Sequence, residues 1–252
     1  MNLAAHTQID QDRPELVICI PGPWKDRSQL VQSIASQTAG GFLLAGFVLS
    51  DTRSQDAVKL EYEPRSSPMR RSFEIAARGN FPQELLTKID QHEGVVFIHF
   101  PVQILKERKR VASFTGAIRR CGGLAVKIES AGIAHEWDRW LYVLTSGDAA
   151  DLYKSFVAIV RDSAHYYSCG MHHFELPDTE ADGSMPTREA VNLIDQFNYW
   201  RIVERPEITS GSTFSVAPDK PVYRVTLGKD ARHENDDPFH NESGVWTLER
   251  SS

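Results

Sequence analysis

Short apolar runs alternate with stretches of helical period over the first hundred residues of the chain. Four runs predict strands: ELVICI (15–20), FLLAGFVLS (42–50), AVKLEYE (57–63) and GVVFIHF (94–100). The stretches between them predict three helices. The first begins at Asp26 and is ended by Gly40 and Gly41, and the others cover 70–78 and 82–93. Residues 15–100 therefore predict the order β-α-β-β-α-β, which is that of a ferredoxin-like unit.

The second half of the chain predicts further helices over 102–121, 136–144 and 148–161, with a strand, LAVKIE, at 124–129. A faint repeat then follows. A strand near Tyr166, a helix over 187–204 and the strands GSTFSV and VYRVTL repeat the β-α-β-β order of the start. This order suggests internal duplication, although turns also fall at such spacings by chance. GVWTLE, at 244–249, predicts a last edge strand.

Together these elements predict the α+β class, with mixed sheets and ferredoxin-like β-α-β-β units. We expect an extended or disordered N-terminus at 1–14, one α+β domain at 15–227, and an acidic C-terminal tail at 228–252 that packs back on the domain. The runs LVICI, VVFIHF and LAVKI are apolar almost throughout, so we expect central strands that are covered on both faces.

The charge of the chain restricts its partners. A net charge of −6 over 252 residues lacks the basic footprint of a nucleic-acid-binding protein and favours basic partners. No apolar run approaches the roughly 20 residues that span a bilayer, and the polar start lacks the apolar region of a signal peptide. The cysteines, Cys19, Cys121 and Cys169, lie far apart, so we expect reduced thiols. We therefore expect a cytoplasmic protein without a membrane or nucleic-acid partner.

Several catalytic motifs are excluded by their spacing. The chain has no G-x-x-x-x-G-K-[ST] loop for phosphates. HEWDRW, which begins at His135, has Arg139 where a zinc protease needs its second histidine. The basic run KERKR (106–110) lies on a predicted amphipathic helix, where a solvated face is its commoner meaning.

Residues 165–180, HYYSCGMHHFELPDTE, hold the densest group of potential metal ligands. Cys169, His172 and His173 are of the types that zinc prefers. However, neighbouring residues of a strand point to opposite faces, so a strand over 170–176 lets only His173 share a side with Cys169. No four ligands have the spacing of a zinc site. We therefore predict a structural stretch that holds no metal and no other cofactor.

Five long stretches resemble a bacterial family of unknown function, numbered 4261: LVICIPGPWKDRSQL, GGLAVKIESAGIAH, YYSCGMHHFELPD, RPEITSGSTFSV and DDPFHNESGVW. The resemblance runs from about Leu16 to Trp246. It implies a single bacterial α+β domain without an established reaction, cofactor or catalytic residue. It also implies a gene that is sometimes found near toxin-delivery genes, where an immunity role is expected.

The motif PFHN in the tail is expected to fold back toward the histidine-rich stretch. This contact predicts a polar cluster drawn from two ends of the chain: Cys169, His172, His173, Glu175, His240 and Asn241. Such a cluster is either a functional site or an anchor for the tail, and the sequence leaves both open.

We expect a protein that is not an enzyme but binds a partner, most concretely an immunity protein that neutralises a basic toxin such as a nuclease. Three acids of the tail are the expected contacts: Glu234, Asp236 and Asp237. A solvated terminus is the alternative meaning of these acids. Two other classes stay open. One is an accessory module that binds a small ligand between two ferredoxin-like halves, and the other is a metal-dependent hydrolase that uses His172, His173, Glu175 and His240.

Overall fold

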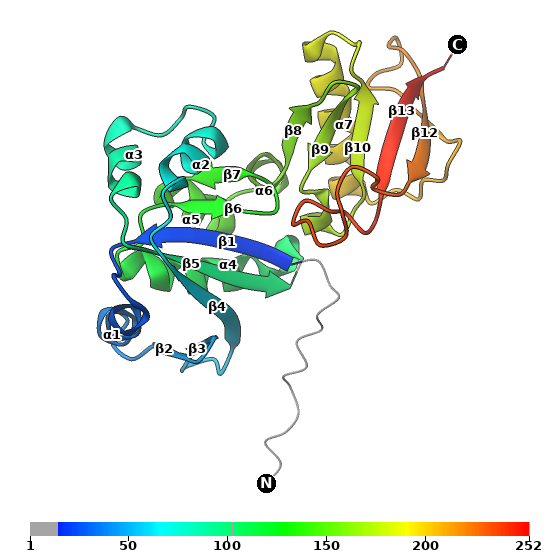
Figure 1. Cartoon of the computed structure of the whole chain (residues 1–252). Helices are drawn as coiled ribbons and strands as arrows, with labels where there is room; N and C mark the ends of the chain where they lie inside the picture. Colours follow the sequence, from blue (N-terminus) through cyan, green and yellow to red (C-terminus); the bar gives the residue numbers. More distant parts are fainter. Residues whose placement is uncertain (1–14, 102, 252) are drawn as a thin grey trace.

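The computed structural model describes residues 15–101 and 103–251. They form two β-sheets with helices packed on them, which confirms the α+β class (Figure 1). The expected extended or disordered segment at 1–14 lies outside the described residues.

The first sheet has the strand order β2-β3-β4-β5-β1-β6-β7. Its strands are β1 (Glu15–Gly22), β2 (Phe42–Ala45), β3 (Val48–Asp51), β4 (Ala57–Pro64), β5 (Gly94–Pro101), β6 (Val126–Ile128) and β7 (Ile133–His135). Each strand runs antiparallel to its neighbours. The apolar runs predicted as central strands are β1, β5 and β6, and each of them has a strand on both sides.

Both faces of these central strands are covered, because successive side chains point to opposite sides. On one face, Ile18 and Ile98 lie in a core that α1 (Arg27–Gln37), α4 (Ile104–Arg120), α5 (Trp137–Thr145) and α6 (Ala149–Phe156) complete. On the other face, Cys19 and Val95 pack with α2 (Met69–Ala76) and α3 (Gln83–Asp90). The expectation of cover on both faces is confirmed, and Cys19 is fully buried.

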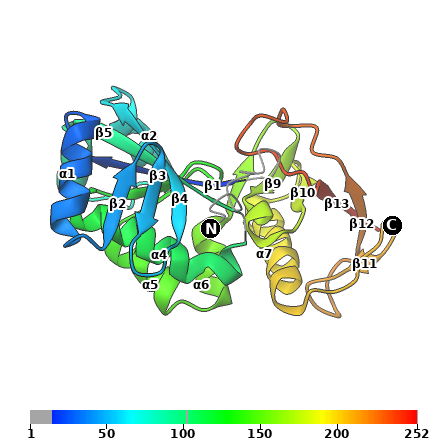
Figure 2. The same cartoon turned by 90° about the horizontal axis from the view of Figure 1, so that it is seen from below.

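The second sheet has the strand order β11-β12-β13-β10-β9-β8 (Figure 2). Its strands are β8 (Ala158–Arg161), β9 (His165–Cys169), β10 (Asp178–Asp182), β11 (Thr213–Phe214), β12 (Tyr223–Gly228) and β13 (Val245–Arg250). Helix α7 (Thr187–Glu204) covers one face, where Ile194 and Phe197 pack with Tyr166, Trp246 and Leu248. The predicted bounds of this helix are confirmed.

The strand arrangement corrects the ferredoxin-like prediction. In a ferredoxin-like unit, each helix connects two parallel strands between which another strand lies. In the first sheet, α2 and α3 instead connect β4 to β5, which are antiparallel and adjacent. Both sheets nevertheless follow one path. In each sheet, a first strand is followed by a helix and then by a meander whose last strand lies beside the first strand. These strands are β1 to β5 in one sheet and β10 to β13 in the other. The second meander has one strand fewer, so β13 runs parallel to β10.

Four local predictions also differ from the structure. FLLAGFVLS forms a hairpin, β2 and β3, because Gly46 adopts a left-handed conformation (φ +54°) that allows a two-residue turn. The helix expected over 148–161 ends at Phe156, and the next residues form β8. The stretch expected as a strand over 170–176 is instead the 3₁₀-helix η1 (Met171–Phe174). Finally, GVWTLE is not an edge strand, since β13 lies between β12 and β10.

Candidate functional site: a pinned surface loop and its buried anchor

The turn after β9 brings the two adjacent histidines together. Gly170 adopts φ +113°, and a Cβ atom at this position would stand 2.2 Å from the backbone oxygen of Phe156. The chain therefore reverses here into η1, and the ring centroids of His172 and His173 lie 4.0 Å apart. The prediction that His172 and His173 point to opposite faces of a strand is wrong, because Gly170 introduces a sharp turn before them.

Both imidazoles are sealed from solvent. His173 is fully buried, and its Nε2 lies 3.2 Å from Ser130 Oγ on the turn after β6. Nδ1 of each ring has no hydrogen-bond partner among the described residues. Burial lowers the pKa of His172 to about 4 and holds that of His173 well below its usual value, so both rings are neutral at pH 7.

Asp178, at the start of β10, is the centre of the buried cluster. Its Oδ1 accepts hydrogen bonds from Ser168 Oγ (2.8 Å) and the Met171 amide (3.2 Å), and its Oδ2 accepts one from Asn241 Nδ2 (2.7 Å). Burial raises the pKa of Asp178 to about 6, against the opposing effect of these hydrogen bonds. Asp178 thus ties the η1 turn to a residue 63 positions further along the chain.

Arg201 of α7 lies beside this cluster and is also buried. Its Nη2 donates hydrogen bonds to Pro177 O and Thr179 Oγ1, both at 2.9 Å, and its guanidinium lies 4.7 Å from the Phe197 ring centroid. Burial lowers the pKa of Arg201 to about 9. The side chain fastens α7 to the segment that leads into β10.

Residues 229–244 form a compact Ω-loop between β12 and β13. The sixteen residues contain no helix or strand, and the residues that flank them, Gly228 and Val245, are paired across the two strands. Gly244 closes the loop at φ +89°, where a Cβ atom would stand 2.2 Å from Gly228 O. A loop with adjacent ends and its own internal packing is of a kind that is frequently functional.

The carboxylate of Asp230 stabilises the loop by hydrogen bonds to its other residues. Its carboxylate accepts hydrogen bonds from the amides of Arg232 (3.0 Å) and Asn241 (3.1 Å), and it lies 3.0 Å from His233 Nδ1. Burial alone would raise the pKa of Asp230, but the bonds from His233 and from these amides outweigh it and lower the pKa. The carboxylate is therefore the charged acceptor around which the loop folds.

Three further side chains fasten the loop to its surroundings. Arg232 pairs with Asp162 (3.1 Å) and Glu180 (2.8 Å), and its guanidinium lies 3.9 Å from the Tyr167 ring centroid. Asn241 donates to Leu176 O (3.0 Å) as well as to Asp178. The Phe239 ring stands 3.6 Å from where a Cβ atom on Gly132 would lie, so the loop packs against the turn between β6 and β7.

The structure brings together part of the predicted polar cluster. Cys169, His172, His173 and Asn241 are all buried, Asn241 is hydrogen-bonded to Asp178, and burial raises the pKa of the Cys169 thiol. His240 lies at the rim, with Nδ1 3.1 Å from His233 O. Glu175 is exposed and accepts a hydrogen bond from Gln103 Nε2 (2.8 Å).

The predicted hydrolase site therefore does not converge, because Glu175 turns away from the two buried histidines. In residues 15–101 and 103–251, no group of three or more His, Cys, Asp or Glu side chains is placed to hold a metal ion. The cluster instead anchors the Ω-loop.

The loop displays acidic side chains on its outside. Glu234, Asp236 and Glu242 are exposed, beside one exposed base, Lys229. Asp237, the third predicted contact, is half-buried, and its Oδ1 accepts a hydrogen bond from the Phe239 amide (2.8 Å). Asp237 therefore shapes the loop, whereas Glu234 and Asp236 face solvent.

Sequence reasoning missed four charged residues of this region: Asp178, Arg201, Asp230 and Arg232. Asp178 stands inside the stretch HYYSCGMHHFELPDTE, but the strand that it begins, DTEAD, is polar and gave no sign that its first residue is buried. Arg201 bonds to Thr179, 22 positions away, and Arg232 bonds to Glu180 and Asp162, 52 and 70 positions away, which no local pattern reveals. The partners of Asp230 lie within the loop itself, 2 to 11 positions away.

Comparison of the chain with protein-family models, with curated proteins and with solved structures finds no match. Among the described helices, none is long and apolar enough to cross a membrane.

Proposed function

We propose that the protein is a non-catalytic binding protein and that the Ω-loop contacts a basic protein partner. The observation that carries this proposal is the anchoring of the loop by Asp230, Arg232 and Asn241. Loops of more than about 12–15 residues without secondary structure are usually functional or disordered. A loop that is fixed in advance loses less conformational entropy when it binds, which favours affinity.

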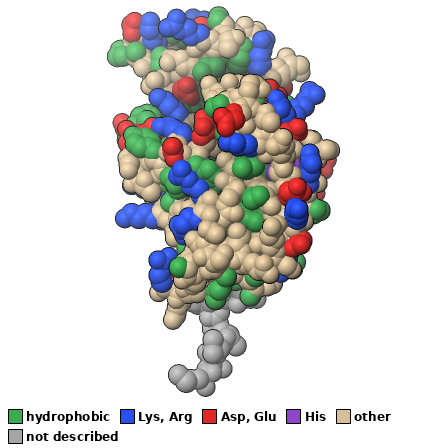
Figure 3. Space-filling model, turned by 90° about the vertical axis from the view of Figure 1, so that its left-hand side faces the viewer, with side chains coloured by type: hydrophobic (Ala, Val, Ile, Leu, Met, Phe, Trp, Pro, Cys, Tyr) green, Lys and Arg blue, Asp and Glu red, His purple; other side chains and the backbone are tan. Residues whose placement is uncertain are grey.

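The charges of the loop support a basic partner. Glu234, Asp236 and Glu242 outnumber the exposed Lys229, and the whole chain carries a net charge of −6. Complementary charge steers association and selects among partners more than it adds affinity. On the face shown in Figure 3, Lys and Arg side chains are scattered among acidic and hydrophobic ones, without the continuous basic stripe that nucleic-acid binding requires.

Within this class, we propose an immunity protein that neutralises a toxin encoded nearby and acts in the cytoplasm. The resemblance of the sequence to a family that is sometimes found near toxin-delivery genes supports this choice. A toxin that degrades nucleic acid is usually basic around its active site, so it would be complementary to the acidic loop. Protection requires that little free toxin remains, which corresponds to a Kd of about 1 nM or below.

The sealed cluster supports a role without catalysis. His172, His173 and Asp178 are each less than 5% exposed, so a substrate has no access to them. The hydrogen bonds of Asp178 hold η1, β10 and the Ω-loop together.

Co-expression with each toxin gene of the neighbourhood tests the proposal. The wild-type protein should rescue growth and co-purify with one toxin. The variant Glu234→Lys/Asp236→Lys should rescue less well. A matched control, Glu63→Lys/Glu93→Lys, reverses two exposed acids, one on β4 and one directly before β5, that have no ion-pair partner among the described residues, and it should rescue like the wild type. Absence of rescue and binding with every neighbouring toxin would refute the immunity role.

A further inference from the structure

A hollow of about 290 Å³ opens where the end of α2 faces β7 and the adjoining parts of α5 and α6. Its walls include six polar or charged side chains: Arg78, Asn80, His135, Glu136, Arg139 and Lys154. Apolar residues of α2 and β7, Ala76 and Ile133 among them, complete it. We call it the His135 hollow. It lies apart from the polar cluster around Asp178, and none of the Ω-loop residues lines it.

Positive charge dominates the His135 hollow. Arg78 and Lys154 are exposed and have no ion-pair partner within the described parts of the chain. Arg139 pairs with Asp151 at 2.9 Å, and Asp151 does not line the hollow. Glu136 is the one acid among the lining residues. Two unpaired cations, Arg78 and Lys154, therefore face one carboxylate, and Arg139 adds a cation that Asp151 offsets, so the hollow keeps an excess of positive charge.

His135 contributes a hydrogen-bond acceptor to this basic site. Its side chain is 9% exposed, and its ring is stacked on Trp140, with the centroids 5.8 Å apart. Nε2 lies 2.9 Å from the backbone oxygen of Ser155 and must carry the proton, because a carbonyl can only accept. Burial, together with the charges of Arg139 and Arg78, lowers the pKa of His135 to about 4. At neutral pH, Nδ1 is therefore a bare acceptor, and it has no partner among the described residues.

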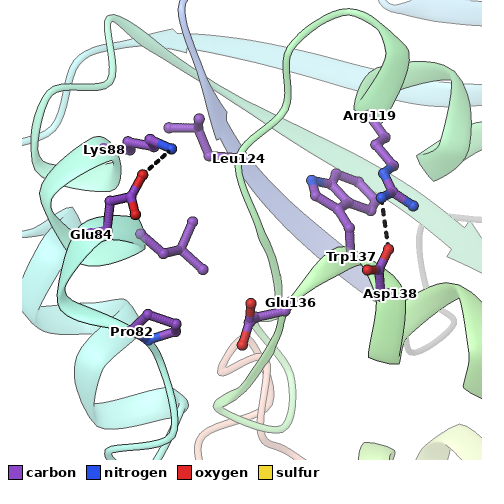
Figure 4. A pocket seen from close by; sticks show the side chains of 9 residues that line it. Pro82, Glu84, Lys88, Arg119, Leu124, Glu136, Trp137 and Asp138 are labelled. Carbon is purple, nitrogen blue, oxygen red and sulfur yellow. Dashed lines mark hydrogen bonds and ion pairs between the residues drawn. The ribbon is translucent and has the colours of Figure 1, made fainter.

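The neighbouring hollow, between α3 and α5, differs from the His135 hollow in its charge (Figure 4). Its two bases are already neutralised, because Lys88 pairs with Glu84 at 2.8 Å and Arg119 pairs with Asp138 at 2.7 Å. Glu136 lines this hollow too and adds a further acid. Two adjacent hollows of similar size thus differ in charge, and only the His135 hollow combines unpaired cations with a buried acceptor.

We propose that the His135 hollow binds a small phosphate monoester that carries a hydroxyl group. A phosphate monoester has a charge of about −1.5 to −2 at pH 7, so the excess of positive charge in the hollow attracts it. Arg78, Arg139 and Lys154 bind its oxygens by charge-assisted hydrogen bonds. The hydroxyl group donates to His135 Nδ1, which gives the site a preference that charge alone would not supply. The volume lies at the lower limit of ligand pockets, about 300 Å³, and excludes a dinucleotide.

This inference does not depend on the proposed binding of a toxin, and titration of the full-length protein by calorimetry tests it separately. Glycerol 3-phosphate should bind, and inorganic phosphate, which lacks the glycerol hydroxyl groups, should bind more weakly. Arg78→Gln/Lys154→Gln should weaken binding at least about tenfold, since each charge-assisted bond that is lost corresponds to roughly that factor. Arg71→Gln, which removes an exposed charge from α2 outside the hollow, should bind like the wild type.

A second measurement locates the ligand. In a nitrogen-15 NMR spectrum of the histidine rings, the Nδ1 resonance of His135 should have the position of an unprotonated nitrogen and should shift when glycerol 3-phosphate is added. The proposal is overturned if neither probe binds at about 10 mM, which corresponds to an affinity too weak to matter. It is also overturned if the double variant binds as the wild type does, or if the His135 resonance stays in place when the ligand is bound.

Discussion

Asp178 illustrates how single buried groups decide the stability of this protein. The carboxylate is held by three hydrogen bonds from neutral donors, and its pKa is raised because burial outweighs them. The buried histidines, His135, His172 and His173, are shifted in the opposite direction, since burial disfavours their charged form. These shifts have opposite consequences for stability between pH 4 and pH 6.5.

Stability should fall when the pH is lowered from about 6.5 to 4. In this range the unfolded chain protonates its histidines and the folded chain does not, so acid favours unfolding by about 3 kcal/mol for His172 and similarly for His135. Asp178 acts the other way, because its folded form takes up a proton more readily than its unfolded form, and it offsets about 2 kcal/mol of this loss of stability. The histidines outweigh this single acid. Urea unfolding at several pH values measures the net change.

Two variants separate the contributions. His172→Gln should reduce the loss of stability between pH 6.5 and 4, and Asp178→Asn should make the loss steeper. His165→Gln, at the half-buried start of β9, is the control for a histidine replaced outside the buried cluster. A wild-type protein whose stability is constant or rises over this range would contradict the assigned burial of the histidines.

At the scale of elements, the predictable parts are those with a local signal. β1, β5 and α7 follow from apolar runs or periods in their own sequences, and their bounds were predicted closely. β8 was missed because Leu152, Phe156, Ile159 and Val160 fit a helical period as well as two successive elements. η1 was missed because its turn depends on Gly170 lying against Phe156, a tertiary contact. The contacts that anchor the Ω-loop could not be predicted from the sequence for the same reason, since they too are tertiary contacts.

The closure of the Ω-loop should be more sensitive than a turn of similar conformation elsewhere. Gly244 and Gly79 both have positive φ, +89° and +75°, so an alanine is strained at either position. A Cβ atom at Gly79 meets nothing within 4 Å, whereas one at Gly244 would collide with Gly228 O at 2.2 Å. Gly79→Ala should cost about 1 kcal/mol, the penalty of the left-handed conformation alone. Gly244→Ala should cost about 3 kcal/mol or more, because backbone has to move.

Urea unfolding measures both costs, and limited proteolysis locates the change. The Gly244→Ala protein should be cut within 229–244 before it is cut elsewhere, while Gly79→Ala keeps the wild-type pattern. Equal destabilisation by the two substitutions, with an intact loop, would show that the ends of the loop are not closed as described.

At the scale of the whole molecule, the two sheets are joined by the same residues that hold the loop. Met171 and Phe174 of η1 belong to the core of the first sheet, while Asp178 begins a strand of the second. The loop in turn leaves the second sheet and lays Phe239 against Gly132 in the first. A surface that rests on both sheets is held in place more firmly than a loop attached to one, and this favours its use as a preformed binding surface.

The central claim is that the Ω-loop is a preformed acidic surface for a basic protein partner. Its most direct test is the rate of association with the purified toxin from the same gene neighbourhood, measured at low and high salt. The rate should fall as salt screens the charges. Glu234→Lys/Asp236→Lys should slow association at least about tenfold at low salt and change dissociation little, as expected for charges at the rim of an interface. Glu63→Lys/Glu93→Lys should behave like the wild type. Equal rates for the two double variants would place the contact elsewhere and contradict the claim, as would a wild-type protein that does not bind.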